Sequence, residues 1–363
     1  MKTLAVVLGA GLACVAVAAC GSRTGLDGEG SGGSGGEYFL PGVPHAGGGS
    51  GGAGVKPDAG VDAAPDALPD APMPPPLKPD CTDPSVTYIY VVTDQGELFS
   101  FDPQTLQFKP KGFLACPANG QSPFSMAVDR KGTAFVLYYD GVPGDPGTLF
   151  RVSTKDGSCK ALPFQPGQQG FLTFGMGFAT IGAGPTEQLF VAAAMETGSS
   201  LSALATVDTT SFKLSKVSDF KPPQGGVELT GTGDGRLFGF AADPFGQGSH
   251  ILQLDKATAT VIADVALPSV NQGMGWAFGF WGGSFWMFTS PNGVTSDVTK
   301  YDPVTGKVGV VATLSSVVVG AGVSTCAPEL VGARSLESLM TTISTSPRAR
   351  RRADDGARPR ENR

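Results

Sequence analysis

Histidine and charged side chains are scarce in this chain of 363 residues. It has only two histidines, His45 and His250, and charged residues make up 16% of the sequence. Two histidines so far apart argue against a histidine-based zinc site and against a Ser-His-Asp triad. The formal net charge is −6, and the segments 21–80 and 81–326 each carry a net negative charge. Nucleic acid is therefore not expected as a partner.

Long hydrophobic runs are also missing, apart from residues 3–19, which are too short and too rich in Gly and Ala for a membrane-spanning helix. This run ends in Val17-Ala18-Ala19-Cys20-Gly21, and small residues directly before a cysteine resemble the lipobox of bacterial lipoprotein signal peptides. The resemblance implies a signal peptide over 1–19, acylation of Cys20 and stable membrane anchoring by several acyl chains. Gly rather than Asp after the cysteine implies the outer membrane of the cell envelope. An ordinary signal peptide with an incidental cysteine is the alternative.

The next segment, residues 20–80, has the composition of a disordered linker. Gly and Ser repeats are followed from residue 57 by a run rich in Pro, Asp and Ala, which predicts a flexible tether and then a stiffer spacer. Asp58, Asp62, Asp66 and Asp70 recur every fourth residue, and carboxylates are ligands that Ca²⁺ prefers. The prolines between them prevent a helix that would gather these side chains, so we expect neither a metal site nor a cofactor.

A repeat of about 50 residues organises residues 81–326. In each copy a short apolar strand leads into Asp or Ser, a turn and a second strand, and the copies start at residues 98, 149, 204, 251 and 298. Such a period built from strands predicts a propeller. The residue after the strand is expected to form the turn, because a type I turn needs a side-chain acceptor there. These residues are Asp102, Ser153, Asp208, Asp255 and Asp302.

Each of the last four hairpins is preceded by a small-residue strand, a glycine turn and an aromatic-rich strand, so that a repeat forms a four-stranded antiparallel blade. The first repeat lacks the inner strand, whereas residues 317–325 have inner-strand composition with no hairpin after them. We therefore predict an all-β, five-bladed propeller whose ring is closed by the C-terminal strand, which leaves no exposed edge there. A sixth, degenerate blade near residues 165–200 is the alternative.

Four of the six cysteines lie beyond the signal region, and an even number in an exported protein suggests disulfide bonds. Cys81 and Cys326 flank strands of the blade that both termini share, and they should lie on the same face, so we predict a Cys81–Cys326 bond. A Cys116–Cys159 bond follows only by elimination. Cys116 ends one outer strand and Cys159 begins the next, which would place them toward opposite faces.

The links between blades combine Asn or Gln with Gly. In a propeller such links gather around one mouth of the central channel, where neutral donors and acceptors would suit a sugar or a peptide backbone, and a tryptophan there would add a flat surface. Alternatively, these amides cap turns and tie neighbouring loops together. The candidate ligand-binding residues are Asn119, Gln121, Gln168, Gln169, Gln224, Asn271, Gln272 and Trp276.

Catalytic motifs are not evident. Some five-bladed propellers are glycosidases that use paired carboxylates near the axis, but the inner-strand region offers Glu228, with Asp129 and Asp234 at its far ends, and one well-placed acid is not a pair. No nucleophile elbow, metal-ligand spacing or reactive thiol stands out. The Asp302-Pro303-Val304-Thr305-Gly306 hairpin, together with the signal, resembles bacterial surface lipoproteins with propeller repeats.

These features lead us to expect a monomeric, non-enzymatic binding or scaffolding module of the cell envelope, with a glycan, a peptide or an envelope protein as partner. A carbohydrate-active hydrolase and a purely structural envelope component are the alternatives. Residues 327–363 are expected to be a disordered tail outside the fold. Arginine occurs eight times in the last thirty residues and four times before them, so the tail is suited to anionic lipid headgroups, or it is a coding-frame artefact.

Overall fold

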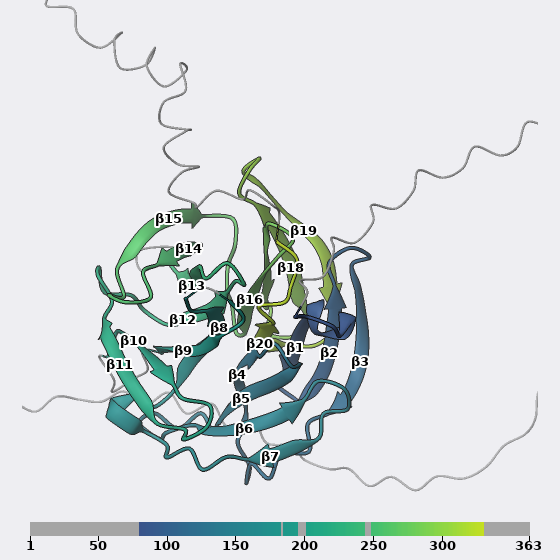
Figure 1. Cartoon of the computed structure of the whole chain (residues 1–363). Coiled ribbons are helices and arrows are strands. Elements are labelled where there is room, and N and C mark those ends of the chain that lie inside the picture. Colours follow the sequence, from purple (N-terminus) through teal and green to yellow (C-terminus); the bar gives the residue numbers. More distant parts are fainter. Residues whose placement is uncertain (1–79, 183, 195–200, 244–247, 330–363) are drawn as a thin grey trace, which may run out of the picture. The chain divides into compact units, whose positions relative to one another are not determined.

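The computed structural model describes residues 80–182, 184–194, 201–243 and 248–329. In these ranges twenty strands form five four-stranded antiparallel sheets, joined by two short 3₁₀ helices, η1 (Pro84–Thr87) and η2 (Gln168–Gly170). The sheets are arranged as blades around one axis (Figure 1). The predicted five-bladed propeller is therefore confirmed. The six-blade alternative is wrong, because residues 165–200 contribute the two inner strands of the third blade. The predicted signal peptide, Cys20, nearly all of the linker and residues 330–363 lie outside the described residues.

Each blade is given from its inner to its outer strand. The first consists of β20 (Val318–Val323), β1 (Ile89–Thr93), β2 (Glu97–Asp102) and β3 (Gln107–Phe113), and the second of β4 (Ser122–Val128), β5 (Thr133–Tyr139), β6 (Thr148–Ser153) and β7 (Cys159–Ala161). The third consists of β8 (Phe174–Thr180), β9 (Glu187–Ala193), β10 (Ala203–Val207) and β11 (Leu214–Asp219). The fourth consists of β12 (Val227–Gly231), β13 (Leu237–Ala242), β14 (Ser249–Leu254) and β15 (Val261–Leu267), and the fifth of β16 (Trp276–Trp281), β17 (Ser284–Thr289), β18 (Ser296–Asp302) and β19 (Lys307–Leu314).

The inner strands β20, β4, β8, β12 and β16 surround the axis (Figure 1). They carry small residues because their backbones approach one another closely. A Cβ atom added to Gly175 would lie 2.1 Å from the carbonyl oxygen of Val227, and one added to Gly231 would lie 2.3 Å from that of Phe178. No side chain fits at such distances, so glycine is required where adjacent blades meet. Large aromatic and aliphatic side chains of the second and third strands fill the wider space between blades.

The repeated Asp residues form turns, as predicted. The Oδ1 atom of Asp208 accepts hydrogen bonds from the backbone N–H groups of Thr210 and Ser211, at 3.0 and 2.6 Å. Equivalent backbone bonds are made by the side chains of Asp102, Ser153, Asp255 and Asp302. These side-chain oxygens accept from backbone N–H groups of the turn that have no carbonyl partner. The repeated Asp or Ser therefore stabilises the turn.

The ring closes where β20 pairs with β1, with Ile89 opposite Val323. Cys81, ahead of η1, and Cys326, after β20, form a disulfide bond with their Cα atoms 5.7 Å apart, in the predicted pairing. The bond ties together the two ends of the propeller domain, which are separated by 245 residues in sequence.

Cys116 and Cys159 form a second disulfide bond, with a Cα separation of 4.9 Å. The expectation that these residues point toward opposite faces is wrong. Blades twist strongly, so the end of β3 runs alongside the turn between β6 and β7, where the N–H of Ala115 donates to the carbonyl of Gly157 at 3.4 Å. The disulfide bond therefore joins the outer strands of the first two blades.

Residues 324–329, which we call the C-terminal strap, contact the other four blades after β20 ends. The hydroxyl of Thr325 bonds to Arg130 of the second blade and Glu187 of the third. The N–H of Gly233 in the fourth blade donates to the carboxylate of Glu329 at 2.7 Å, and the N–H of Gly282 in the fifth donates to the carbonyl of Pro328 at 2.8 Å. Residues 328 and 329 thus bond to the propeller beyond the disulfide bond and beyond the boundary predicted at Cys326.

Replacing both Cys81 and Cys326 by Ala is expected to lower the free energy of unfolding by about 5 kcal/mol, since the chain-entropy model scales with the length of the closed loop. The Cys116→Ala/Cys159→Ala variant closes a shorter loop, of 43 residues, and should lose about 4 kcal/mol. Urea denaturation under oxidising conditions measures both values. A loss below about 1 kcal/mol in the first variant would contradict a clasp at the ring closure.

A chain ending at Cys326 is expected to be less stable than a chain ending at Glu329 by about 1–3 kcal/mol, because Gly233 and Gly282 lose their acceptors. Thermal unfolding of the two truncated chains compares them directly, and the disulfide bond is present in both. Equal unfolding midpoints would show that the last three residues of the strap contribute nothing.

Candidate ligand-binding sites

The up-and-down order of the strands sorts the loops onto two faces of the ring. One, the link face, carries the links between blades and the loops between the second and third strands of each blade. The other, the strap face, carries the remaining turns, the disulfide bond of Cys81 and the C-terminal strap. All the amides singled out in the sequence belong to the links between blades.

Four of these amides are used by the chain itself. Gln168 donates to the carbonyl of Phe212 at 3.0 Å and accepts from the N–H of Leu214 at 3.0 Å, and Gln169 likewise bonds to the backbone of β11. Gln224 donates to the carbonyl of Pro222, and Asn271 accepts from the N–H of Gly273. For these residues the alternative interpretation holds, in which the amides tie loops together.

The other four candidates lie in two places. Asn119 and Gln121 line a hollow of about 250 Å³ with Asp140, Thr148 and Phe150. Gln272 and Trp276 precede and begin β16. The Nε2 atom of Gln272 and the Nε1 atom of Trp276 are both buried and have no hydrogen-bond partner within the described part of the chain. A buried donor without an acceptor costs about 1–3 kcal/mol. The lack of an acceptor for Gln272 and Trp276 is therefore unusual for a folded protein.

The acids suggested by the sequence do not form a catalytic pair. Glu228 on β12 is 6% exposed, and it accepts hydrogen bonds from the hydroxyl of Ser125 at 2.9 Å and from the N–H of Met176. Burial raises the pKa of Glu228 well above its usual value, which favours the protonated form. Asp129 accepts from the backbone of its own turn, and Asp234 bonds to Arg236. Each acid is therefore satisfied by neighbouring groups of the scaffold.

A half-buried acid that sequence reasoning missed lies at the start of β9, where it bonds to the C-terminal strap. Glu187 accepts from the N–H of Arg130 and from the hydroxyl of Thr325, both at 2.8 Å. Burial, aided by the charge of Asp129, raises the pKa of Glu187 to about 7. The guanidinium of Arg130 also bonds to Thr325 and forms an ion pair with Asp80. No local pattern marks Glu187, because its partners are 57 and 138 residues away in sequence.

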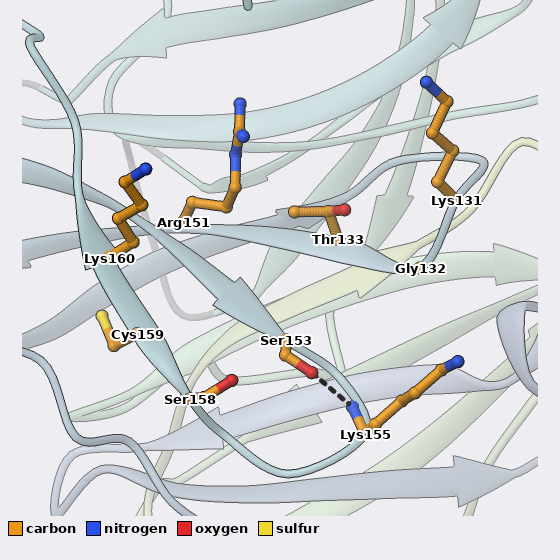
Figure 2. A pocket seen from close by; sticks show the side chains of 9 residues that line it. All are labelled: Lys131, Gly132, Thr133, Arg151, Ser153, Lys155, Ser158, Cys159 and Lys160. Carbon is orange, nitrogen blue, oxygen red and sulfur yellow. Dashed lines mark hydrogen bonds between the residues drawn. The ribbon is translucent and has the colours of Figure 1, made fainter.

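A second missed feature is a hollow of about 340 Å³ on the second blade, which we call the basic hollow (Figure 2). It lies toward the strap face, between the turn after β4 and the strands β5, β6 and β7. Four cationic side chains line it without any acidic residue, and serine and threonine supply hydroxyl groups. The lining residues are Lys131, Gly132, Thr133, Arg151, Ser153, Lys155, Ser158, Cys159 and Lys160. No motif in the sequence marks this hollow. It depends on the register that places Arg151 opposite Lys160, and the repeat alone does not specify that register.

In the described ranges, no three residues among His, Cys, Asp and Glu are grouped to hold a metal ion. None of the helices described there is long and apolar enough to cross a membrane. The two disulfide bonds are typical of exported proteins.

Comparison with known proteins identifies no family for this chain. No protein-family model matches the chain, and no curated protein matches its sequence. Among solved structures, TolB from Acinetobacter baumannii is 12% identical, with a TM-score of 0.36, over 62% of this chain and 53% of the TolB chain. Regucalcin from Agrobacterium tumefaciens, a calcium-binding protein, is 14% identical, with a TM-score of 0.37, over 67% and 77% of the two chains. A luciferin-regenerating enzyme is 13% identical over 70% and 80%, also at 0.37. At these scores the similarities carry no argument about function.

The raised pKa of Glu187 predicts a loss of stability with rising pH. The carboxyl of Glu187 binds its proton more tightly in the folded state than in the unfolded state, where its pKa is the ordinary 4.5. The stabilisation that this proton binding gives the folded state is therefore complete below pH 4.5 and is lost as the pH rises through 7. Relative to the wild type, Glu187→Gln should gain on the order of 3 kcal/mol between pH 4.5 and pH 8. Urea denaturation across this range measures the difference, and parallel profiles of the two proteins would contradict it.

Proposed function

We propose that this chain is a non-catalytic binding module of the bacterial cell envelope, which uses the link face of its propeller to hold a neutral polar ligand. The ligand class is a glycan or the backbone of an envelope peptide. An acylated Cys20 would anchor the protein in the outer membrane, and residues 21–80 would tether the propeller, which acts as a monomer. The disulfide bonds agree with an exported protein.

The observation that carries the proposal is the pair of unused donors at Gln272 and Trp276. Buried polar groups in folded proteins nearly always have hydrogen-bond partners. The described chain supplies no acceptor for an amide Nε2 and an indole Nε1, both of which are buried. Hydroxyl and carbonyl oxygens of a neutral ligand provide such acceptors, and the indole ring offers the flat apolar surface on which sugar rings lie.

Among the described residues, the acids that the sequence singled out form no catalytic pair, which supports binding rather than hydrolysis. Glu228 is isolated among hydroxyl and backbone donors, whereas a glycosidase needs two carboxyl groups about 5–10 Å apart. Asp129 and Glu187 do interact electrostatically, but they lie on the strap face. Glu187 is held by Arg130 and Thr325, and Asp129 by the backbone of its own turn. The chain therefore offers no reason to assign hydrolysis to the link face.

A glycan array probed with the whole mature chain, followed by titration of tryptophan fluorescence, tests the proposal. The Gln272→Leu and Trp276→Phe variants remove the two unused donors and keep most of the side-chain volume. Both are expected to weaken binding about tenfold, the loss of one hydrogen bond of about 1.4 kcal/mol, without lowering the unfolding temperature.

Gln169→Leu is the matched control. Its amide is used by the backbone of β11, so this variant should lose stability and keep the affinity for the ligand. Two results would count against the proposal. One is an array, together with a pulldown of envelope proteins, that yields no ligand. The other is the reverse pattern, in which Gln272→Leu loses stability while binding is unchanged.

A further inference from the structure

We propose that the basic hollow of the second blade is a separate binding site for a small ligand that carries a phosphate group. This site is distinct from the link-face site, because its lining residues come from turns of the strap face and from the outer strands of a single blade. Its ligand is anionic, whereas the ligand proposed for the link face is neutral.

The register of the second blade brings like charges together. Arg151 on β6 lies directly opposite Lys160 on β7, and Phe135 on β5 lies opposite Arg151 on its other side. The guanidinium of Arg151 stands over the ring of Phe135, 5.7 Å from its centroid, and the side chains of Arg151 and Lys160 extend from adjacent strands into the hollow (Figure 2). Like charges directly opposite each other destabilise a strand pair, so this arrangement is unfavourable unless an anion lies between them.

Protein groups do not provide that anion. Arg151, Lys160, Lys131 and Lys155 form no ion pair within the described residues, and no carboxylate lines the hollow. Lys131 and Lys155 act only at longer range on Asp129 and Asp83, and both of these carboxylates are hydrogen-bonded within their own turns. Asp156, which follows Lys155, is likewise hydrogen-bonded to Ser158 within its turn. The residues 81–326 contain 14 Lys and Arg against 19 Asp and Glu, so a hollow lined by four cations and no carboxylate is unexpected on this acidic domain.

The shape of the second blade creates space for a ligand. Its outer strand β7 has three residues, against six to eight in the outer strands of the other blades. The hollow of about 340 Å³ falls within the range of small-molecule sites. The site offers one planar guanidinium and three flexible ammonium groups. A phosphate, with its higher charge and several oxygen atoms, matches these groups better than a ligand with a single carboxylate does. The hydroxyl of Ser153 accepts from the N–H of Lys155 and donates to the carboxylate of Asp156, so the cationic side chains are the groups available to a ligand oxygen.

Calorimetric titration of the full chain at low ionic strength, with inorganic pyrophosphate and with a hexose phosphate, tests the proposal. The wild type should bind both probes, and binding should weaken as salt is added, because the cations are exposed. Arg151→Gln should weaken binding about tenfold, or about 1.4 kcal/mol, and Arg151→Gln/Lys160→Gln should weaken it further. Without ligand, each variant should unfold at an equal or higher temperature than the wild type, since a like-charge contact is removed.

Lys213→Gln/Lys307→Gln is the control, because it makes the same change in net charge at exposed cations outside the hollow. Its affinity for pyrophosphate should stay within twofold of the wild type. Vesicles containing an anionic phospholipid separate a lipid headgroup from a soluble phosphate. The proposal is overturned if neither soluble probe binds at millimolar concentration, if only vesicles bind, or if the control weakens binding as much as the Arg151→Gln/Lys160→Gln variant.

Discussion

The structure depends on the pairing of β20 with β1, which turns a linear set of strands into a closed ring. This pairing is possible because β20 is nearly free of large side chains at the axis. A Cβ atom on Gly320 would lie 2.8 Å from the backbone nitrogen of Met126, and one on Gly322 would lie 2.7 Å from that of Val128. Once β20 is in place, Cys326 meets Cys81, all loops are assigned to one of two faces, and the chain that follows β20 must leave on the strap face.

The consequence is that the two faces differ in chemistry. The C-terminal strap bonds to turns of four blades, and one of its partners is the half-buried Glu187, whose pKa is raised. The link face has no comparable strap among the described residues, and its amides divide between those that bond to the chain and those that do not. Binding chemistry therefore remains available on the link face and on the flank of the second blade, rather than beneath the strap.

The fold was more accessible from the sequence than the sites were, for a physical reason. Blade number, the turn role of Asp208 and the glycines of the inner strands follow from interactions within one repeat or between equivalent repeats. Whether an amide side chain finds a hydrogen-bond partner within the chain does not follow from such interactions. Gln168 and Gln272 have the same composition around them in the sequence, but only Gln168 meets backbone groups of β11, 44 to 46 residues away. Likewise, the contact between Arg151 and Lys160 requires the register of β6 and β7, and the strap contacts of Glu187 require the closed ring.

Most polar groups in this propeller are satisfied within the chain, which gives the exceptions their weight. Asp129, Asp208, Gln168 and Ser296 all have partners at hydrogen-bond distance. Against that background, two buried N–H donors on the link face are local violations of this pattern, and four cations gathered around one hollow without a carboxylate in its lining are an unusual concentration of charge. Such violations in otherwise consistent structures are where binding sites are expected.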